Sequence, residues 1–334
     1  MYCRTNRRDD GCVFSSGKQT TGSTVAIFKV EEKEGVSRDF LLYCLQHSID
    51  SLAGHSHGST MKHIKKSALD HHSVFLPPLP EQEKIAEILG SVDAAIEATQ
   101  GVIDQITRTK KALMTELLQG KKDAAGNITP WEKVRFSEVT RELKKRNTDG
   151  ALGIEKVMGV NKALGIVPMR RETIGSSLDR YKILPPNAFA YNPMRLNIGS
   201  LAMCNKTQPV MVSPDYVVFE CRENVLNPSY FNHFRRSHIW DRFMEIAGNG
   251  SVRIRIYYKD LASLRLPLPS LEEQGKIVKI LDGADTVQAT NQARLNQLKK
   301  LKTALMQALL TGTVRVPVQT TIQHTNQHKE VVNG

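Results

Sequence analysis

The stretch from Leu79 to Gly120 carries the most regular pattern of apolar residues in the chain. Its apolar positions recur at alternating steps of four and three residues, which is typical of a heptad helix that pairs with another helix. Two positions of the series are polar, Thr99 and Lys110. The apolar positions that we expect to pair helices are Ile85, Leu89, Val92, Ile96, Ile103, Ile106, Leu113 and Leu117. A helix of roughly 40 residues would extend about 60 Å, and a helix of that length needs a partner.

A second stretch repeats the first one 192 positions further along the chain. LPEQEKIAEIL begins at Leu79, LEEQGKIVKIL begins at Leu271, and the match continues without a gap to Gly120 and Gly312. The repeated charged positions are Asp93 with Asp285 and Lys110 with Lys302. The positions expected to pair helices in the second stretch are Ile277, Leu281, Leu295, Leu298, Leu305 and Leu309. The chain is therefore an internal duplication built around two long helices.

Both helices have recognisable start and stop signals. Proline-rich segments, residues 76–80 and 266–269, precede them, and proline suits the residues before or at a first helical turn. Ser270 and Glu273 have the spacing of a capping box. Gly120 and Gly312 follow the last apolar residues, so we expect them to be C-caps.

The duplication also includes the sequence before each helix. In the first copy the pattern predicts a strand over 25–30, a helix over 38–50 and a strand over 61–64. In the second copy it predicts a strand over 215–221, one helix over 227–246 and a strand over 252–258. Phe40 aligns with Phe231 at a shift of 191, so one small insertion separates this register from that of the helices. The second globular part begins near Trp131, and its counterpart would begin well before Met1, so we expect the first part to lack its N-terminal portion.

Composition narrows the class of protein. The chain has 334 residues, 40% of them hydrophobic, which is enough for two domains with their own cores. Its formal net charge of +12 favours a polyanionic partner, nucleic acid first, although many basic proteins bind no polyanion. The five cysteines show neither a paired framework nor CxxC spacing, which fits a reducing cytoplasm. The sequence contains neither an 18-residue apolar window nor an apolar N-terminal signal.

The repeated phrases resemble those of a known family. LPPLPEQEKIAEIL and LPLPSLEEQGKIVKIL each lead into a helix that ends in KKALMTELLQG or LKTALMQALLTG. These phrases resemble the repeated regions of type I restriction–modification specificity (S) subunits. WEKVRF, residues 131–136, resembles the opening of a target recognition domain of that family, and YNPMRLNIGSLA, residues 191–202, extends the resemblance.

The resemblance implies an α+β fold, in which two mixed α/β target recognition domains, the first one incomplete, are separated by two long antiparallel coiled-coil helices. The implied segments are a partial first target recognition domain (1–78), a first spacer helix (79–120), a linker (121–130), a second target recognition domain (131–269), a second spacer helix (270–313) and a polar, disordered tail (314–334).

The resemblance also implies a non-catalytic DNA reader. Members of this family direct adenine methylation and DNA cleavage by partner subunits to a bipartite target in double-stranded DNA. The implied partners are two modification subunits, which use S-adenosylmethionine, and restriction subunits, which use ATP and Mg; no cofactor is expected in this chain. Because its first domain is short, one expectation left open is that the chain reads only the half-site assigned to its second domain.

Basic residues follow a Gly-Ser turn in both copies, at residues 58–59 and 250–251. We expect them to position DNA phosphates, and the alternative is a solvated basic face. These residues are Lys62, Lys65, Lys66, Arg253, Arg255 and Lys259. Other side chains of the second domain suit guanine or adenine edges, and the alternative for each is an ordinary surface residue. They are Lys156, Asn161, Lys162, Arg170, Arg171, Arg180, Arg195 and Asn197.

Metal binding and catalysis are not favoured by the sequence. The histidines His55, His57, His63, His71 and His72 have no ligands in the matching segment 248–250, and no cysteine has zinc-site spacing beside them. The segment Asn192-Pro193-Met194-Arg195 lacks the second proline and the aromatic residue of an adenine methyltransferase loop. No Walker-type loop is present. Two other classes remain open: a coiled-coil assembly protein that organises partners without reading DNA, and an autonomous methyltransferase.

Overall fold

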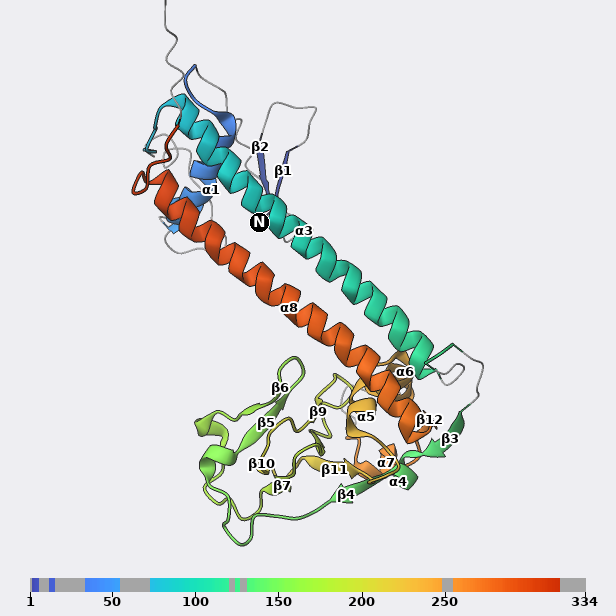
Figure 1. The fold of residues 1–334 in the computed structure, drawn as a ribbon. Coiled ribbons are helices and arrows are strands. Elements are labelled where there is room, and N and C mark those ends of the chain that lie inside the picture. The colour runs from blue at the N-terminus through green and yellow to red at the C-terminus, as the bar shows by residue number, and fades with distance from the viewer. Residues whose placement is uncertain are drawn as a thin grey trace, which may run out of the picture. The chain divides into compact units, whose positions relative to one another are not determined.

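The computed structural model describes residues 2–5, 12–15, 34–54, 73–119, 124–126, 131–247 and 255–318. The chain divides into two compact units, which we call unit 1 (Met1–Val102 with Asn291–Gly334) and unit 2 (Ile103–Thr290). The fold is α+β, as predicted, and Figure 1 shows its helices and strands. In the part of the chain that the structure describes, no helix is both long and apolar enough to cross a membrane.

The two long helices are α3 (Leu79–Leu118) and α8 (Leu271–Leu310), each of 40 residues. The predicted seam positions of α3 are buried or half-buried along its whole length, Thr99 and Lys110 included. Those of α8 are buried or half-buried as well. Gly312 adopts a φ of 73°, which is the left-handed conformation expected of a glycine C-cap, whereas Gly120 lies outside the described residues.

In unit 1 the helix α1 (Arg38–Gly54) covers one end of the helix pair. Phe40 and Cys44 of α1 share a core with Ile85 and Leu89, from the start of α3, and with Met306, Leu309 and Leu310, from the end of α8. The two long helices are therefore antiparallel in this unit. The strands β1 (Tyr2–Thr5) and β2 (Cys12–Ser15) form a separate antiparallel pair.

Unit 2 contains a four-stranded antiparallel sheet in the order β4-β11-β8-β9. Its strands are β4 (Thr140–Leu143), β11 (Val217–Cys221), β8 (Phe189–Tyr191) and β9 (Leu201–Met203). Successive strand residues face opposite sides of a sheet, and the core divides accordingly. Phe189 and Phe219 belong to the larger core, which includes Leu117 and Ile277 of the long helices, whereas Ala190 and Val218 belong to a smaller core.

Shorter elements complete unit 2. Paired strands are β3 (Glu132–Arg135) with β12 (Arg265–Leu268), β5 (Met158–Asn161) with β6 (Gly165–Pro168), and β7 (Lys182–Leu184) with β10 (Val210–Val212). The remaining helices are α4 (Phe136–Val139), α5 (Pro228–Phe234), α6 (His238–Ala247), α7 (Tyr258–Leu261), η1 (Ile154–Lys156) and η2 (Arg171–Thr173).

The prediction of one helix over 227–246 is wrong, because the structure has α5 and α6 there. The buried Ser237 starts a new helix: its carbonyl accepts the N–H of Asp241 at 3.1 Å, and its hydroxyl accepts the N–H of Trp240 at 3.5 Å. Serine is a favoured N-cap, and its signal was hidden inside an otherwise helical pattern. The predicted helix over 38–50 and the predicted strand over 215–221 are confirmed as α1 and β11.

The prediction of a strand over 252–258 is also wrong where it can be checked. Residues 255–257 form no strand, and α7 begins at Tyr258. The carboxylate of Asp260 accepts the N–H of Tyr257 at 2.7 Å, which favours a helix start over a continued strand. Residues 252–254 and the predicted strands over 25–30 and 61–64 lie outside the described residues.

Candidate functional site

Gln82, in the first turn of α3, joins three backbone groups of unit 1. Its Oε1 accepts the N–H of Ser37 at 2.8 Å, and its Nε2 donates to the carbonyl oxygens of Gly35 at 3.0 Å and Pro77 at 2.7 Å. The side chain is buried, so each of these bonds satisfies a group that has little access to water. Gln82 thereby links the start of α3 to two segments: the residues at the start of α1 and the proline-rich segment that precedes α3.

Gln274 makes the same three bonds in unit 2. It accepts the N–H of Asn227 at 2.7 Å and donates to the carbonyl oxygens of Val225 at 3.0 Å and Pro269 at 2.9 Å. Asn227 precedes α5 as Ser37 precedes α1, and the two residues lie 190 positions apart. The predicted alignment of Phe40 with Phe231 is therefore wrong by one residue, because this hydrogen-bonded register pairs Phe40 with Tyr230.

Glu81 and Glu273, next to these glutamines, bind the segment that follows the opposite long helix. The buried Glu81 accepts Nε–H and Nη2–H of Arg315 at 2.9 and 2.6 Å, and the N–H of Val316 at 3.0 Å. These bonds, Arg315 first, lower the pKa of Glu81 to about 2. Glu273 accepts the N–H of Ala124, which lies 192 positions before Val316. The repeated Glu-Gln of the two phrases thus encodes one hydrogen-bonding unit, used once in each half.

A groove of about 1360 Å³ lies in unit 2 between the β5–β6 turn, the loop leading into β9, and helices α5 and α6. Two of the predicted DNA-contacting residues, Lys162 and Asn197, line it. Asn232, Arg235 and Arg236 line it as well, although the sequence did not single them out. Other polar groups on its wall are Asn205, Asp241 and Glu245.

Arg235 is the most constrained cation of this groove. Its Nε–H donates to Oδ1 of Asn232 at 2.9 Å, which fixes the plane of the guanidinium group. Burial, and secondarily the charge of Arg236, lowers the pKa of Arg235 to about 10, so the group stays charged at neutral pH. No carboxylate of the described residues forms an ion pair with it. An oriented guanidinium without a carboxylate partner can bind a phosphate or the edge of a guanine.

The other predicted contact residues are dispersed over unit 2. Oδ1 of the exposed Asn161 accepts the N–H groups of Ala163 and Leu164 at 2.8 and 3.0 Å, so this oxygen is engaged in the β5–β6 turn. Exposed positions are Arg170, Arg171, Arg180, Arg195, Arg255 and Lys259, whereas Lys156 is half-buried. Lys62, Lys65, Lys66 and Arg253 lie outside the described residues.

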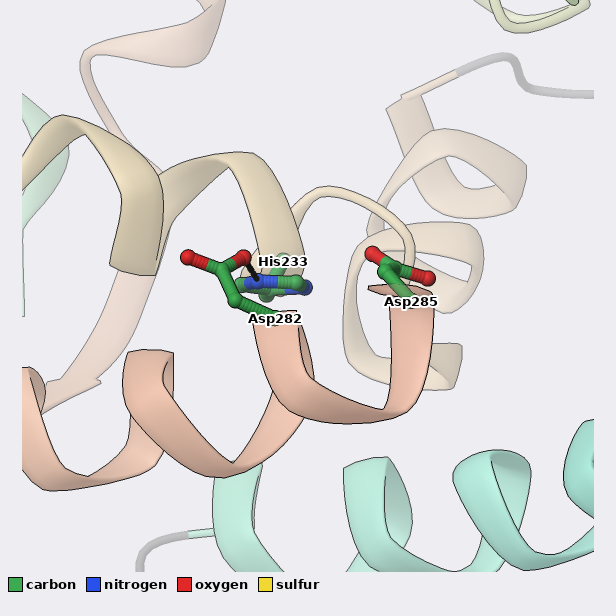
Figure 2. Close-up of side chains that lie close together, drawn as sticks. All are labelled: His233, Asp282 and Asp285. Carbon is green, nitrogen blue, oxygen red and sulfur yellow. Dashed lines mark hydrogen bonds and ion pairs between the residues drawn. The ribbon is translucent and has the colours of Figure 1, made fainter. Parts of the chain in front are cut away.

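A cluster of His233, Asp282 and Asp285 has the composition of a metal site (Figure 2). Nε2 of the buried His233 forms a hydrogen bond of 2.8 Å with Asp282, and Asp285 is ion-paired with Lys110 and, at 3.7 Å, with Arg236. Burial lowers the pKa of His233, and the bond to Asp282 opposes that effect. A neutral His233 donating to Asp282 accounts for this geometry without a metal. The histidines from His55 to His72 lie outside the described residues.

Comparison with known proteins gives a consistent match. The family model described as the type I restriction modification DNA specificity domain matches residues 5–108 and 177–300. The chain is 28% identical to the MjaX type I restriction enzyme specificity subunit of Methanocaldococcus jannaschii over 284 residues, which are 76% of this chain and 62% of that protein. It is 25% identical to the MjaVIII specificity subunit of the same organism over 332 residues, 92% of this chain and 77% of that one.

Among solved structures, the fold is similar to the S subunit of a type I restriction–modification system from M. genitalium. The TM-score is 0.51 at 14% identity, over 86% of this chain and 74% of that one. This likeness concerns the fold alone. The chain spans less than two thirds of the length of the MjaX relative.

Proposed function

The chain belongs to the type I restriction modification DNA specificity family, and from that premise we propose that it is the DNA recognition subunit of a type I restriction–modification complex. In this role it directs adenine methylation and DNA cleavage by partner subunits to a bipartite target. Catalysis resides in the partners: modification subunits use S-adenosylmethionine, and restriction subunits use ATP and Mg. The chain itself binds the DNA and orients the partner subunits on it.

The observation that carries this proposal is the repetition of one polar unit at the start of both long helices. Gln82 and Gln274 each fasten a globular part to a helix by the same three bonds. A protein that reads two half-sites needs two such attachments and a spacer between them. We propose readers at 1–78 and 131–269, the boundaries implied by the sequence, and the two attachments support this division.

DNA contact in the second reader is assigned to its groove and to exposed basic side chains elsewhere in unit 2. Lys162, Asn197, Arg235 and Arg236 line the groove, and arginine is the side chain best suited to hold a phosphate or a guanine edge in a fixed plane. Arg170, Arg171 and Arg195 are exposed and available for phosphate contacts. The net charge of +12 supports a polyanionic partner.

Two modification subunits are the proposed protein partners of the long helices. In unit 2, Ile280 and Val287 of α8 lie seven residues apart and are 38% and 50% exposed. Apolar residues at heptad spacing on the outer face of a helix suit contact with another protein. We place the complex in the cytoplasm, a compartment that suits the free thiols of Cys44, Cys204 and Cys221.

Gel shifts and methylation-protection mapping on genomic DNA, with the modification subunit present, test the proposal. Protection of one recurring sequence is the expected result. Equal binding to all sequences, or none, would favour the coiled-coil assembly protein as the alternative. Binding of S-adenosylmethionine by the isolated chain, measured by calorimetry, would instead point to an autonomous methyltransferase.

A further inference from the structure

Each long helix carries a lysine in its apolar seam, and each lysine forms an ion pair with an aspartate of the other helix. In unit 1, Lys302 of α8 pairs with Asp93 of α3 at 2.6 Å. In unit 2, Lys110 of α3 pairs with Asp285 of α8. The lysine side chains are only 21% and 14% exposed, so neither pair is a loose surface contact. The duplication relates the two pairs, because Lys110 matches Lys302 and Asp93 matches Asp285.

Both pairs define the same helix register. Along two antiparallel helices, residues that face each other in one register have residue numbers with a constant sum. This sum is 395 for both ion pairs, and it is also 395 for the 3.1 Å hydrogen bond from Gln288 to Thr107. A displacement of either helix by one heptad would separate each lysine from its aspartate by about 10 Å along the axis. An apolar seam alone tolerates such a displacement, whereas a polar residue at a seam position selects one register at a cost in stability.

Residues from the globular parts hold these pairs in place. In unit 1, the hydroxyl of Tyr43 in α1 donates to Asp93 at 2.9 Å, and Nζ of Lys302 lies 5.3 Å from the centre of the Tyr43 ring. In unit 2, Arg236, which follows α5, lies 3.7 Å from Asp285. Each pair is thus connected to the globular part of its own unit as well as to both helices.

We propose that Asp93–Lys302 and Lys110–Asp285 are positioning pairs that fix the register of the helices, and thereby the number of base pairs between the two half-sites. The register is a property of the chain alone. Its consequence for the DNA spacer rests on the proposed function.

Thiol trapping in the full chain tests the register. Cysteines replacing Ile96 and Leu298, seam positions of unit 1 whose numbers add up to 394, should form a disulfide in the native register. Cysteines replacing Ile96 and Leu305 report a displacement of one heptad. In the background K110L/K302L, we expect trapping of the displaced pair to rise about tenfold, the size expected for coupled neighbouring charges.

Measuring thermal stability beside the helix register shows whether the ion pairs select the register or only stabilise the fold. Removing both charges of each pair, in D93L/K302L/K110L/D285L, also removes their desolvation cost, so its thermal midpoint should be retained or raised while the register becomes mixed. K110L/K302L leaves two aspartates without counter-ions, so it should melt at a lower temperature. The matched control K111L/K300L changes exposed lysines of the same helices and should keep a single register. The charge exchange D93K/K302D should restore the native register relative to D93K alone. A single native register in K110L/K302L, or no rescue by the exchange, overturns the proposal.

Binding by the complex with the modification subunit then tests the consequence for DNA. With targets whose spacer is lengthened or shortened, K110L/K302L should accept more spacer lengths than the parent chain. A mixed register with an unchanged spacer preference would contradict the proposed spacer role while leaving the register assignment intact. Absence of sequence-dependent binding in the parent chain would instead contradict the proposed function.

Discussion

Gln82 and Gln274 lie 192 residues apart and make the same three hydrogen bonds, each inside its own unit. Each amide accepts one backbone N–H and donates to two carbonyl oxygens. Because glutamine offers both an acceptor and two donors, no other uncharged side chain of this length can satisfy all three groups. The duplication therefore repeats a polar attachment as well as an apolar seam.

Replacement of Gln82 by alanine should destabilise unit 1 by about 3 kcal/mol, at about 1 kcal/mol per lost hydrogen bond. Hydrogen exchange should accelerate in α1, whose first residues are fastened by Gln82. Gln274→Ala should instead accelerate exchange in α5. The exposed Gln105 provides the control, and its replacement by alanine should leave both helices protected. Equal effects of Gln82→Ala on α1 and α5 would contradict the assignment.

The sequence predicted the parts of the fold that follow from periodicity. The seam from Ile85 to Leu117 is buried or half-buried as expected, because a heptad repeat places all these positions on one face of a long helix. Periodicity could not show that Ser237 divides a helical stretch in two, or that Asp260 turns a strand-like pattern into a helix start. Both outcomes depend on single polar side chains that compete for backbone groups.

The candidate site was less predictable, because tertiary packing decides which side chains share the groove. Lys162 and Asn197 could be named from side-chain type, and they share one groove. Arg235 was missed because it sits in the helical pattern where the sequence gives no sign of a helix end. Its position opposite the β5–β6 turn arises from tertiary packing. The sequence also could not show that the side-chain oxygen of Asn161 is engaged in the β5–β6 turn, which leaves its amide N–H groups as the donors available for a base.

The bond between Glu81 and Arg315 should make the segment after α8 sensitive to acid. The pKa of Glu81 is lowered from 4.5 to about 2, so its contribution to stability is fully present above pH 4.5 and is lost as pH falls towards 2. The amide of Val316, whose N–H donates to Glu81, should lose protection in that interval when its exchange rate is compared with the intrinsic rate at each pH. The difference between the parent chain and Glu81→Gln should shrink over the same interval. Glu83→Gln, at an exposed position, is the matched control.

His233 should make unit 2 less stable in mild acid. Burial lowers its pKa below the ordinary value of 6.5, so the unfolded chain takes up a proton at a pH where the folded chain does not. Stability should therefore fall as pH drops below 6.5. In His233→Asn, the part of this decrease in the thermal midpoint that comes from His233 should be absent. His238→Asn changes an exposed histidine nearby and should melt like the parent chain at each pH. Identical pH profiles for His233→Asn and the parent chain would sink this prediction.

Arg255 should contribute to DNA affinity without selecting a sequence. It is exposed and, like Arg253, follows Gly250-Ser251 in the sequence, so we expect both arginines to contact phosphates. Each replacement by alanine should weaken binding on all DNA sequences alike and reduce the slope of log affinity against log salt by about 1. Unchanged salt slopes would assign these arginines to a solvated face.

Arg235 should have a larger and more geometric role, since Asn232 holds its guanidinium group in the groove. We expect Arg235→Ala to weaken specific binding by about 1–3 kcal/mol if the group reads a guanine, with a smaller loss on nonspecific DNA. Arg235→Lys keeps the charge but not the planar fork, so it should recover nonspecific affinity without recovering specificity. Arg242→Ala, an exposed arginine of α6 outside the groove, is the matched control. Full rescue by lysine would show that only the charge of Arg235 matters, and an effect equal to that of Arg242→Ala would remove the groove from the DNA interface.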